Sequence, residues 1–379
     1  MRKKKRILFA AVDIGFRIEL YSKFISQYLS DEFTAESFTK FKLAETHYKT
    51  NYTHVCEVSR HSALYVYLYT FCFFVYSLFR YDVFHFFSGE TILTRKLRRF
   101  EFMVYRLLGK RLVMHFVGSD VRNPQFLFWK NEHLIPFLNG ERGVKKTLPW
   151  QDALIRDSRK YADCILVSTP DLLENVPSAR YYPVVIDLEK FDAEVGGVQA
   201  LAERKTLTGK FTILHAPSND KVKGTAFIHE ILDRISSRFG TDVDLITPGD
   251  NIRKTGKLYS VTRYELFELM QKSDILIDQM VIGWYGLQSL EGLLCGNTVL
   301  CYVEEGLEQY LYDNCPVVNV NALTLESELE RRIAQSHHLT VEERLSNIEW
   351  VKKYHTIENN HADLLQAWGA KQIAAKVYS

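Results

Sequence analysis

The chain has 379 residues, and at roughly 100–200 residues per domain this length predicts two domains more readily than one or four. Its 46% hydrophobic and 25% charged residues are typical of a globular protein and exclude a disordered, collagen-like or coiled-coil chain. Lys and Arg exceed Asp and Glu by only 2 (48 against 46), so bulk charge does not indicate a nucleic-acid partner.

Short apolar runs alternate with amphipathic helical stretches, a pattern typical of βα units wound around parallel sheets. Residues 2–6 are basic like the start of a signal peptide, but the apolar run after them ends at Asp13 and is too short to export the chain. We therefore interpret this run as a buried first strand and expect a cytoplasmic protein. In the first half, the apolar runs predict strands at 7–12, 82–87, 111–117, 164–168 and 181–186.

A segment rich in aromatic residues precedes the second of these strands. Twelve of the 23 residues from 65 to 87 are Phe or Tyr. Residues 62–79 carry no charge, and their length is close to the ~20 residues of a membrane span. Because Arg80, Asp82 and a strand follow directly, we expect a buried or interfacial helix rather than a span.

Basic residues crowd the next stretch, where apolar residues recur at helical spacing. A basic face beside an apolar face is typical of a helix that lies on an anionic membrane. A helix that packs its apolar stripe on the sheet and solvates its basic face explains the pattern at least as well, so both interpretations stay open. The basic residues are Arg95, Lys96, Arg98, Arg99, Arg106, Lys110 and Arg111.

In the second half, capping-box spacing in residues 262–265 and 340–343 predicts two helix starts. Periodicity is weakest between 187 and 210, which predicts a linker. Apolar runs predict strands at 211–216, 243–247, 275–280, 298–303 and 316–320. The expected organisation is an N-terminal domain over 1–187, a linker over 188–210, a C-terminal domain over 211–355, and a helical segment over 356–379 for which a return to the first domain is one placement.

Residues 213–225 predict a strand, a polar loop and a helix that starts near Thr225. Free N–H groups at a helix start, a glycine at 224 and two lysines, Lys221 and Lys223, together form a cradle for a phosphate or diphosphate. An ordinary solvated loop between a strand and a helix is the alternative.

Residues 274–296 form a second candidate segment. A buried strand ends at Asp278, a turn rich in glycine and aromatic residues follows, and a helix carries Glu291 before a glycine ends it. Ligands of open α/β sheets bind beyond the carboxyl ends of the strands, where a carboxylate can hold a ribose through its two hydroxyls. The alternatives are a solvent-facing Glu291 and core packing of Trp284 and Tyr285.

Together these two segments resemble the nucleotide-binding half of GT-B glycosyltransferases, specifically the large, mostly retaining group related to bacterial polysaccharide-assembling enzymes. In that family a loop ending in Lys-Gly binds the donor diphosphate, and a Glu in a Gly-aromatic-Gly…Leu-Glu-Gly helix binds the donor ribose. Lys223-Gly224 matches the first motif and Glu291 the second, with Lys221 in place of an Arg that commonly precedes the lysine. The resemblance implies a nucleotide-sugar site made of Lys221, Lys223, Gly224, Thr225, Gly283, Trp284, Gly286 and Glu291.

The first domain and the catalytic groups depart from the family pattern. Gly283 stands where the family has a second acid, eight residues before the ribose Glu, and Asp278 is our candidate for the missing carboxylate. Val117 stands where the family often has a His, and His115 lies two residues earlier on the same strand face. The resemblance thus makes Asp278 and His115 the candidate catalytic residues. It also implies an acceptor-side loop formed by Gly118, Ser119 and Asp120.

The fold implied is α/β of the GT-B type, with two Rossmann-like parallel-sheet domains facing a cleft. The activity implied is transfer of a sugar, with retention of configuration, from a nucleoside diphosphate sugar to a glycan acceptor, which we expect to be lipid-linked and to belong to surface polysaccharide synthesis. We expect no cofactor, no metal and no nucleic acid, and peripheral contact with the anionic inner face of the plasma membrane. The alternatives are a GT-B-like sugar-nucleotide epimerase and a non-catalytic sugar-nucleotide-binding partner of a polysaccharide assembly complex.

Overall fold

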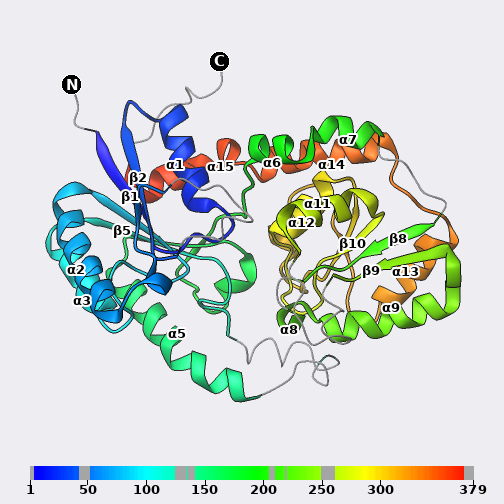
Figure 1. Cartoon of the computed structure of the whole chain (residues 1–379), viewed down its shortest axis with the longest axis horizontal. Coiled ribbons are helices and arrows are strands. Elements are labelled where there is room, and N and C mark those ends of the chain that lie inside the picture. Colours follow the sequence, from blue (N-terminus) through cyan, green and yellow to red (C-terminus); the bar gives the residue numbers. More distant parts are fainter. Residues whose placement is uncertain are drawn as a thin grey trace. The chain divides into compact units, whose positions relative to one another are not determined.

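The computed structural model describes residues 4–41, 52–123, 134, 141–204, 210–217, 220–248 and 261–370. The chain divides into two compact units. The first unit holds Met1–Asn123, Lys145–Val185 and Ile357–Ser379, and the second holds Pro124–Val144 and Ile186–Thr356. Over the described residues, each unit contains a parallel β-sheet with helices packed against it (Figure 1).

The sheet of the first unit has seven strands within the described residues, in the order β3-β2-β1-β4-β5-β6-β7. The strands are β1 (Lys5–Ala10), β2 (Phe33–Thr39), β3 (His54–Val55), β4 (Val83–Phe87), β5 (Arg111–Phe116), β6 (Cys164–Val167) and β7 (Arg180–Tyr181). All neighbouring pairs are parallel. The sequence did not predict β2 and β3. Strand β2 mixes polar and apolar residues, and β3, which among the described residues pairs only with the end of β2, has only two residues.

Alternate side chains of these strands face opposite helical layers. Leu8 belongs to the core beneath α2 and α3, whereas Ile7 belongs to the core beneath α1 and α15. Because both faces are covered, the central strands β1, β4, β5 and β6 are largely apolar, and this made them predictable. The helices are α1 (Arg17–Tyr28), α2 (Ala63–Arg80), α3 (Arg98–Leu107), α5 (Glu141–Tyr161) and α15 (Ile357–Ala367).

The sheet of the second unit has five strands within the described residues, in the order β12-β11-β10-β8-β9. They are β8 (Phe211–Leu214), β9 (Val243–Ile246), β10 (Ile275–Ile277), β11 (Thr298–Cys301) and β12 (Val318–Asn319). The helices are α6 (Leu188–Val195), α7 (Val198–Arg204), α8 (Asp220–Lys223), α9 (Thr225–Phe239), α11 (Arg263–Lys272), α12 (Leu287–Leu294), α13 (Leu325–Ala334) and α14 (Val341–Tyr354). The strand order reverses between β8 and β10, so the chain leaves these two strands in opposite directions along the sheet.

Two local predictions can be compared with this fold. Both predicted helix starts are confirmed, because Thr262 and Thr340 each form a complete capping box at the start of α11 and α14. The linker expected over 188–210 is not irregular, because most of it forms the helices α6 and α7. Its residues 205–209 lie outside the described residues. Its irregular appearance in sequence comes from Gly196 and Gly197, which end α6 before α7 begins.

Candidate functional site

The carboxyl ends of β8 and β10 meet at the point where the strand order of the second sheet reverses. The two strands are paired directly, with Ile213 beside Ile275. The chain after β8 runs into α8, which ends at Lys223, and Asp278 is the first residue after β10. Open α/β sheets bind ligands at such a reversal point, so the fold brings both predicted residues to the expected position.

Lys223 and Asp278 form an ion pair in which Lys223 Nζ donates to Asp278 Oδ1. The other carboxylate oxygen accepts from Ser289 Oγ at 2.5 Å. Burial alone would raise the pKa of Asp278, which is 1% exposed, but the charge and hydrogen bond of Lys223, with further hydrogen bonds from Ser289 and the Gly286 N–H, bring it below its ordinary value. Asp278 is therefore an ionised group that fixes the lysine ammonium rather than one presented to a sugar.

Gly224 adopts the left-handed conformation (φ 75°) and precedes α9, whose start has no side-chain cap. A Cβ at this position would lie 3.0 Å from Val281 Cγ2, so the loop after β10 comes close to the backbone here. The Met280 N–H also donates to the Lys223 carbonyl at 3.1 Å. The turn and the uncapped helix start thus lie beside the lysine, and their N–H groups favour an anion.

His215 determines which hydrogen bonds Thr225 can donate to a ligand. Burial lowers the pKa of His215 to about 4, so the ring is neutral. Its Nδ1 lies 2.9 Å from the Ile277 carbonyl, which can only accept, so its Nε2 accepts from Thr225 Oγ1 at 3.0 Å. Since the single hydroxyl proton of Thr225 is used, a phosphate contact by this residue must come from its backbone N–H. The side chain of Lys221 lies outside the described residues.

The turn after Asp278 is held by the amide of Gln279. Its Oε1 accepts from the N–H groups of Val281 (2.7 Å) and Ile282 (2.6 Å). Its Nε2 donates to the carbonyls of Trp284 (3.2 Å) and Tyr302 (2.8 Å). Nothing in the sequence singles out Gln279, because its partners become neighbours only when the turn is folded.

The rings of Trp284 and Tyr285 are buried and stacked, with centroids 4.9 Å apart. This arrangement corresponds to the core-packing alternative and not to an open platform for a sugar. Gly286, also expected in the nucleotide-sugar site, precedes α12 and uses its N–H on Asp278.

Glu304 occupies the space beside Gly283, where the family pattern would place an acid. Gly283 has φ 84°, and a Cβ there would lie 2.9 Å from Glu304 Cβ and 3.1 Å from Glu304 Oε2. The Glu304 N–H donates to the Gly283 carbonyl at 3.0 Å. A carboxylate therefore reaches this place from the chain after β11. Sequence reasoning missed it, although Glu304 directly follows the predicted strand 298–303.

Glu291 lies inside the second unit on α12 and is paired with Arg263. Its Oε1 accepts from Arg263 Nη1 at 2.6 Å, and Arg263 Nε lies 3.0 Å from Glu194 Oε2. Burial raises the pKa of Glu291, and the charge of Arg263 opposes this shift. A ribose bound at Glu291 would therefore share the carboxylate with Arg263.

His115 is a correction to the expected site. It lies on β5 in the core of the first unit, fully buried, with its Nε2 3.1 Å from Ser168 Oγ and its ring 5.6 Å from those of His85 and Tyr182. Burial, with smaller contributions from His85 and Arg17, holds its pKa well below the ordinary value. A neutral ring enclosed by aromatic neighbours cannot reach a substrate, so His115 is a core residue here.

The loop after β5 contains the predicted acceptor-side residues Gly118, Ser119 and Asp120. The Asp120 carboxylate accepts from the N–H groups of Val117 (3.1 Å) and Gly118 (2.8 Å), and it is buried. Its pKa is raised by burial, against those hydrogen bonds and the charge of Arg122. Asp120 therefore shapes this loop, which lies at the carboxyl edge of the first sheet.

Asp13 is a second residue that sequence reasoning missed. It follows β1 at the same edge, where Oδ1 accepts from the Ile18 N–H and Oδ2 from the Tyr52 hydroxyl, both at 3.2 Å. Burial raises the pKa of Asp13 to about 6, although these hydrogen bonds and the charge of Arg17 oppose the shift. In the sequence, Asp13 only marked the end of an apolar run, because its burial depends on the fold.

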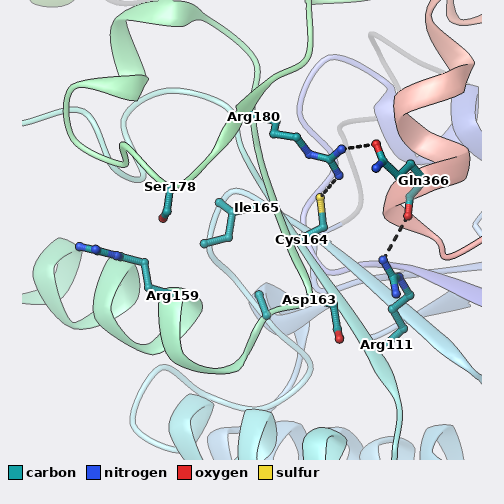
Figure 2. A pocket seen from close by; sticks show the side chains of 9 residues that line it. Arg111, Arg159, Asp163, Cys164, Ile165, Ser178, Arg180 and Gln366 are labelled. Atoms are coloured by element: carbon teal, nitrogen blue, oxygen red, sulfur yellow. Dashed lines mark hydrogen bonds between the residues drawn. The ribbon is translucent and has the colours of Figure 1, made fainter.

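A pocket of about 470 Å³ lies at the opposite, amino edge of the first sheet (Figure 2). Arg111, Cys164 and Arg180 begin β5, β6 and β7 there, and Arg180 donates to the Cys164 sulfur and to Gln366. This edge is not the one where open α/β sheets bind their ligands. Among the described residues, no group of three or more His, Cys, Asp or Glu side chains is arranged to hold a metal ion.

No protein-family model and no curated protein matches the sequence. Solved structures match over nearly the whole chain. HepE of Anabaena in complex with UDP-glucose has a TM-score of 0.59 at 12% identity, covering 96% of this chain and 99% of that one. The catalytic domain of starch synthase IV from Arabidopsis thaliana, bound to ADP and acarbose, has a TM-score of 0.61 at 10% identity, covering 97% and 99%. Sucrose-phosphate synthase from Thermosynechococcus elongatus has a TM-score of 0.55 at 12% identity, covering 97% and 98%.

These similarities confirm the predicted fold class. The chain has the GT-B fold, with two Rossmann-like domains built on parallel sheets.

Proposed function

We propose that the protein is a glycosyltransferase that moves a sugar from a nucleoside diphosphate sugar to a hydroxyl group of a glycan acceptor. The observation that carries this proposal is the Lys223 ammonium, held by the buried Asp278 carboxylate at the reversal point of the second sheet. The similar structures support it, because HepE holds UDP-glucose and starch synthase IV holds ADP in the same fold.

The chemistry follows from the charge that develops during transfer. When the bond between the sugar and the β-phosphate breaks, negative charge grows on the departing diphosphate. Lys223 and the N–H groups at the start of α9 are preorganised to stabilise it without rearrangement of solvent. Gly224 allows the phosphates to approach the backbone, and Asp278 acts as a positioning residue for the lysine.

The carboxylates of Glu291 and Glu304 are the remaining groups of the proposed donor site. Glu291 is proposed to bind the ribose and to share its charge with Arg263. Glu304 takes over the role first expected of Asp278, because its carboxylate lies beside Gly283 and is only partly buried. It is the group that we place nearest to the donor sugar.

The finer parts of the proposal concern the acceptor and the stereochemistry. We propose a lipid-linked glycan acceptor, a role in surface polysaccharide synthesis and retention of the anomeric configuration, all supported by the resemblance of residues 211–303 to the polysaccharide-assembling group. An inverting transfer would need a general base for the acceptor hydroxyl, and Asp13, at the carboxyl edge of the first sheet with a pKa of about 6, is our candidate among the described residues of the first unit. The anomeric proton coupling of the product, measured by NMR, distinguishes the two outcomes.

The test is release of nucleoside diphosphate from UDP-, GDP-, ADP- and TDP-sugars, measured with and without a lipid-linked glycan extract. We expect release with one donor only when the acceptor is present. Glu304→Gln should lower turnover strongly with little change in the donor KM, whereas Glu305→Gln, at the exposed neighbouring position, should not.

Other outcomes would contradict the proposal. Interconversion of the sugar nucleotide without acceptor would assign the chain as an epimerase. Binding of a sugar nucleotide without turnover over a broad acceptor panel would assign a non-catalytic binding partner.

A further inference from the structure

Helix α2 buries only one narrow face. Thr70, Phe73, Phe74 and Ser77 are buried, at the spacing of a single helical stripe. They pack in the core of the first unit, where the Phe74 ring lies 5.7 Å from Tyr105 of α3. With the partly buried Val66, Tyr69 and Leu78, they anchor the helix to the first unit from residue 66 to residue 78.

The opposite face of α2 is apolar and exposed to an unusual degree. The exposed fraction is 70% at Leu64 and 80% at Phe79. No charged residue occurs between residue 63 and Arg80. Soluble proteins seldom expose a contiguous apolar surface of this kind unless it binds something. Its large side chains include Leu64, Tyr67, Leu68, Phe71, Val75 and Phe79.

Helix α3 lies beside α2 and extends this surface (Figure 1), and Phe100 on α3 is 6.3 Å from Phe74 on α2. Phe100, Met103 and Leu107 on α3 are exposed. So are the cations Lys96, Arg99 and Arg106, which lie between or beside them. We call the exposed side chains of these two helices and of residues 95–97 the α2–α3 surface.

The charge on the α2–α3 surface is of one sign. The single acid in residues 91–110 is Glu101, and it is fully buried, where it accepts from the Ile92 and Leu93 N–H groups. Arg98, which the sequence placed in the basic cluster, is buried as well and lies 3.9 Å from Asp157. Arg95 is exposed too, but it is paired with Glu90 at 2.6 Å. Among the described residues, the exposed cations of this surface for which no ion pair with an acid is formed are Lys96, Arg99 and Arg106.

We infer that the α2–α3 surface docks on an anionic lipid monolayer, with the outer face of α2 inserted among the acyl chains and the cations of α3 at the headgroups. An exposed apolar face flanked by cations matches the chemistry of such a membrane. By length and composition α2 could cross a membrane, with 22% of its residues buried. However, Phe73 and Phe74 are packed in the core of the first unit. If α2 spanned the membrane, the helix would leave this core and uncover one face of the sheet.

A second copy of the chain fits this surface less well. In a symmetric dimer the same patch meets itself, so Lys96, Arg99 and Arg106 of one copy would face the same cations of the other. Desolvating like charges against each other is unfavourable, whereas anionic headgroups neutralise them. The inference does not depend on the proposed donor site in the second unit.

Vesicle co-sedimentation of the full chain tests the inference, with neutral phosphatidylcholine and with phosphatidylcholine containing phosphatidylglycerol, at about 0.1 M and about 1 M salt. The apolar variant combines Leu68→Ser, Phe71→Ser and Phe79→Ser. The basic variant combines Lys96→Ser, Arg99→Ser and Arg106→Ser. The control removes three exposed cations of the second unit by Lys272→Ser, Lys352→Ser and Lys353→Ser. Circular dichroism verifies that each variant is folded.

The wild-type protein should bind anionic vesicles at low salt, and each of the two surface variants should bind at least about tenfold more weakly. The control should bind like the wild type, and high salt should weaken binding. Equal weakening in the control, equal binding to neutral vesicles or no binding at low salt would overturn the inference. So would a dimer, found by sedimentation velocity without lipid, that the apolar variant dissociates.

A label at Cys72 tests insertion separately. Cys72 is exposed on the outer face of α2, and Cys315 is the other cysteine that is not buried, so labelling is done on a Cys315→Ser background. A polarity-sensitive fluorophore at Cys72 should shift to the blue when anionic vesicles are added. An unchanged spectrum with vesicles bound would show that α2 stays in water, and the inserted mode would be wrong.

Discussion

Lys223 and Asp278 show at the scale of single residues how the site combines stability with function. The sequence predicts Asp278 at a strand end and Lys223 in the loop before a helix that starts near Thr225. In the fold Asp278 directly follows β10, and Lys223 is the last residue of the short helix α8. Their pairing could not be predicted, because the two residues are 55 positions apart and become neighbours only through the order of β8 and β10. The same limitation hid Glu304, which reaches Gly283 from another strand.

A double-mutant cycle on this pair has a defined outcome. Lys223→Met leaves the buried Asp278 carboxylate without its cation, and this should lower the free energy of unfolding of the second unit by about 3 kcal/mol. The double variant with Asp278→Asn should recover part of that loss, with a coupling energy of about 1–3 kcal/mol in urea unfolding. Additive effects of the two substitutions would show that the ion pair contributes nothing.

Asp13 predicts the direction in which the free energy of unfolding changes with pH. Its pKa in the folded chain is about 6, above the value of 3.8 for a free side chain, so between these values the folded state holds a proton that the unfolded state has lost. Its contribution to stability is therefore present at low pH and is lost as pH rises through 6. Relative to that of the wild type, the free energy of unfolding of the Asp13→Asn protein should rise by about 2 kcal/mol between pH 4.5 and pH 7. No change of this difference with pH would mean that the Asp13 pKa is ordinary.

At the scale of elements, apolar continuity and capping patterns are local features, and the elements that depend on them were predicted. Strands β1, β5 and β11 are apolar at their centres, β4 and β8 each contain one polar residue (His85 and Thr212), and the capping boxes of α11 and α14 each lie within four residues. Edge strands such as β3 and helices such as α6 depend on packing partners that are distant in sequence. The sequence therefore gives weaker signals for them.

The turn between α8 and α9 makes its own prediction. Gly224 (φ 75°, ψ 30°) and Gly196 (φ 78°, ψ 31°) have nearly the same backbone conformation, but only Gly224 has neighbours that a Cβ would meet. Gly196→Ala should cost about 1 kcal/mol for the left-handed conformation. Gly224→Ala should cost more in chemical unfolding and should also weaken nucleotide binding, because the turn moves away from Val281. Equal effects of the two substitutions on binding would remove this turn from the site.

At the scale of the whole molecule, the last described helix, α15, belongs to the first unit, although the chain before it runs through the second unit. Trp368, just after α15, is fully buried against Phe9 and Phe33, and its Nε1 donates to His85 Nδ1 at 3.0 Å. Trp350 on α14 is buried in the second unit against Tyr285. The fold class was predictable from the βα pattern, whereas the unit that receives each C-terminal helix depends on long-range packing.

These two tryptophans form a matched pair for calorimetry. Trp368→Ala should lower the melting temperature of the first unit, with a loss of about 3–5 kcal/mol in its free energy of unfolding. Trp350→Ala should affect the second unit by a similar mechanism and leave the first unchanged. If both substitutions lowered the same transition, the assignment of the C-terminal helices to different units would be wrong.

The proposed function requires that the second unit binds the diphosphate of a nucleotide sugar through Lys223. Calorimetric titration of UDP, GDP, ADP and TDP against the wild type, Lys223→Met and the exposed-lysine control Lys272→Met tests it directly. One nucleoside diphosphate should bind the wild type and the control at one site with equal affinity. The Lys223→Met protein should bind it at least about tenfold more weakly, as expected for loss of a charge-assisted hydrogen bond. Absence of binding by all four, or equal affinity in a folded Lys223→Met protein, would contradict the account.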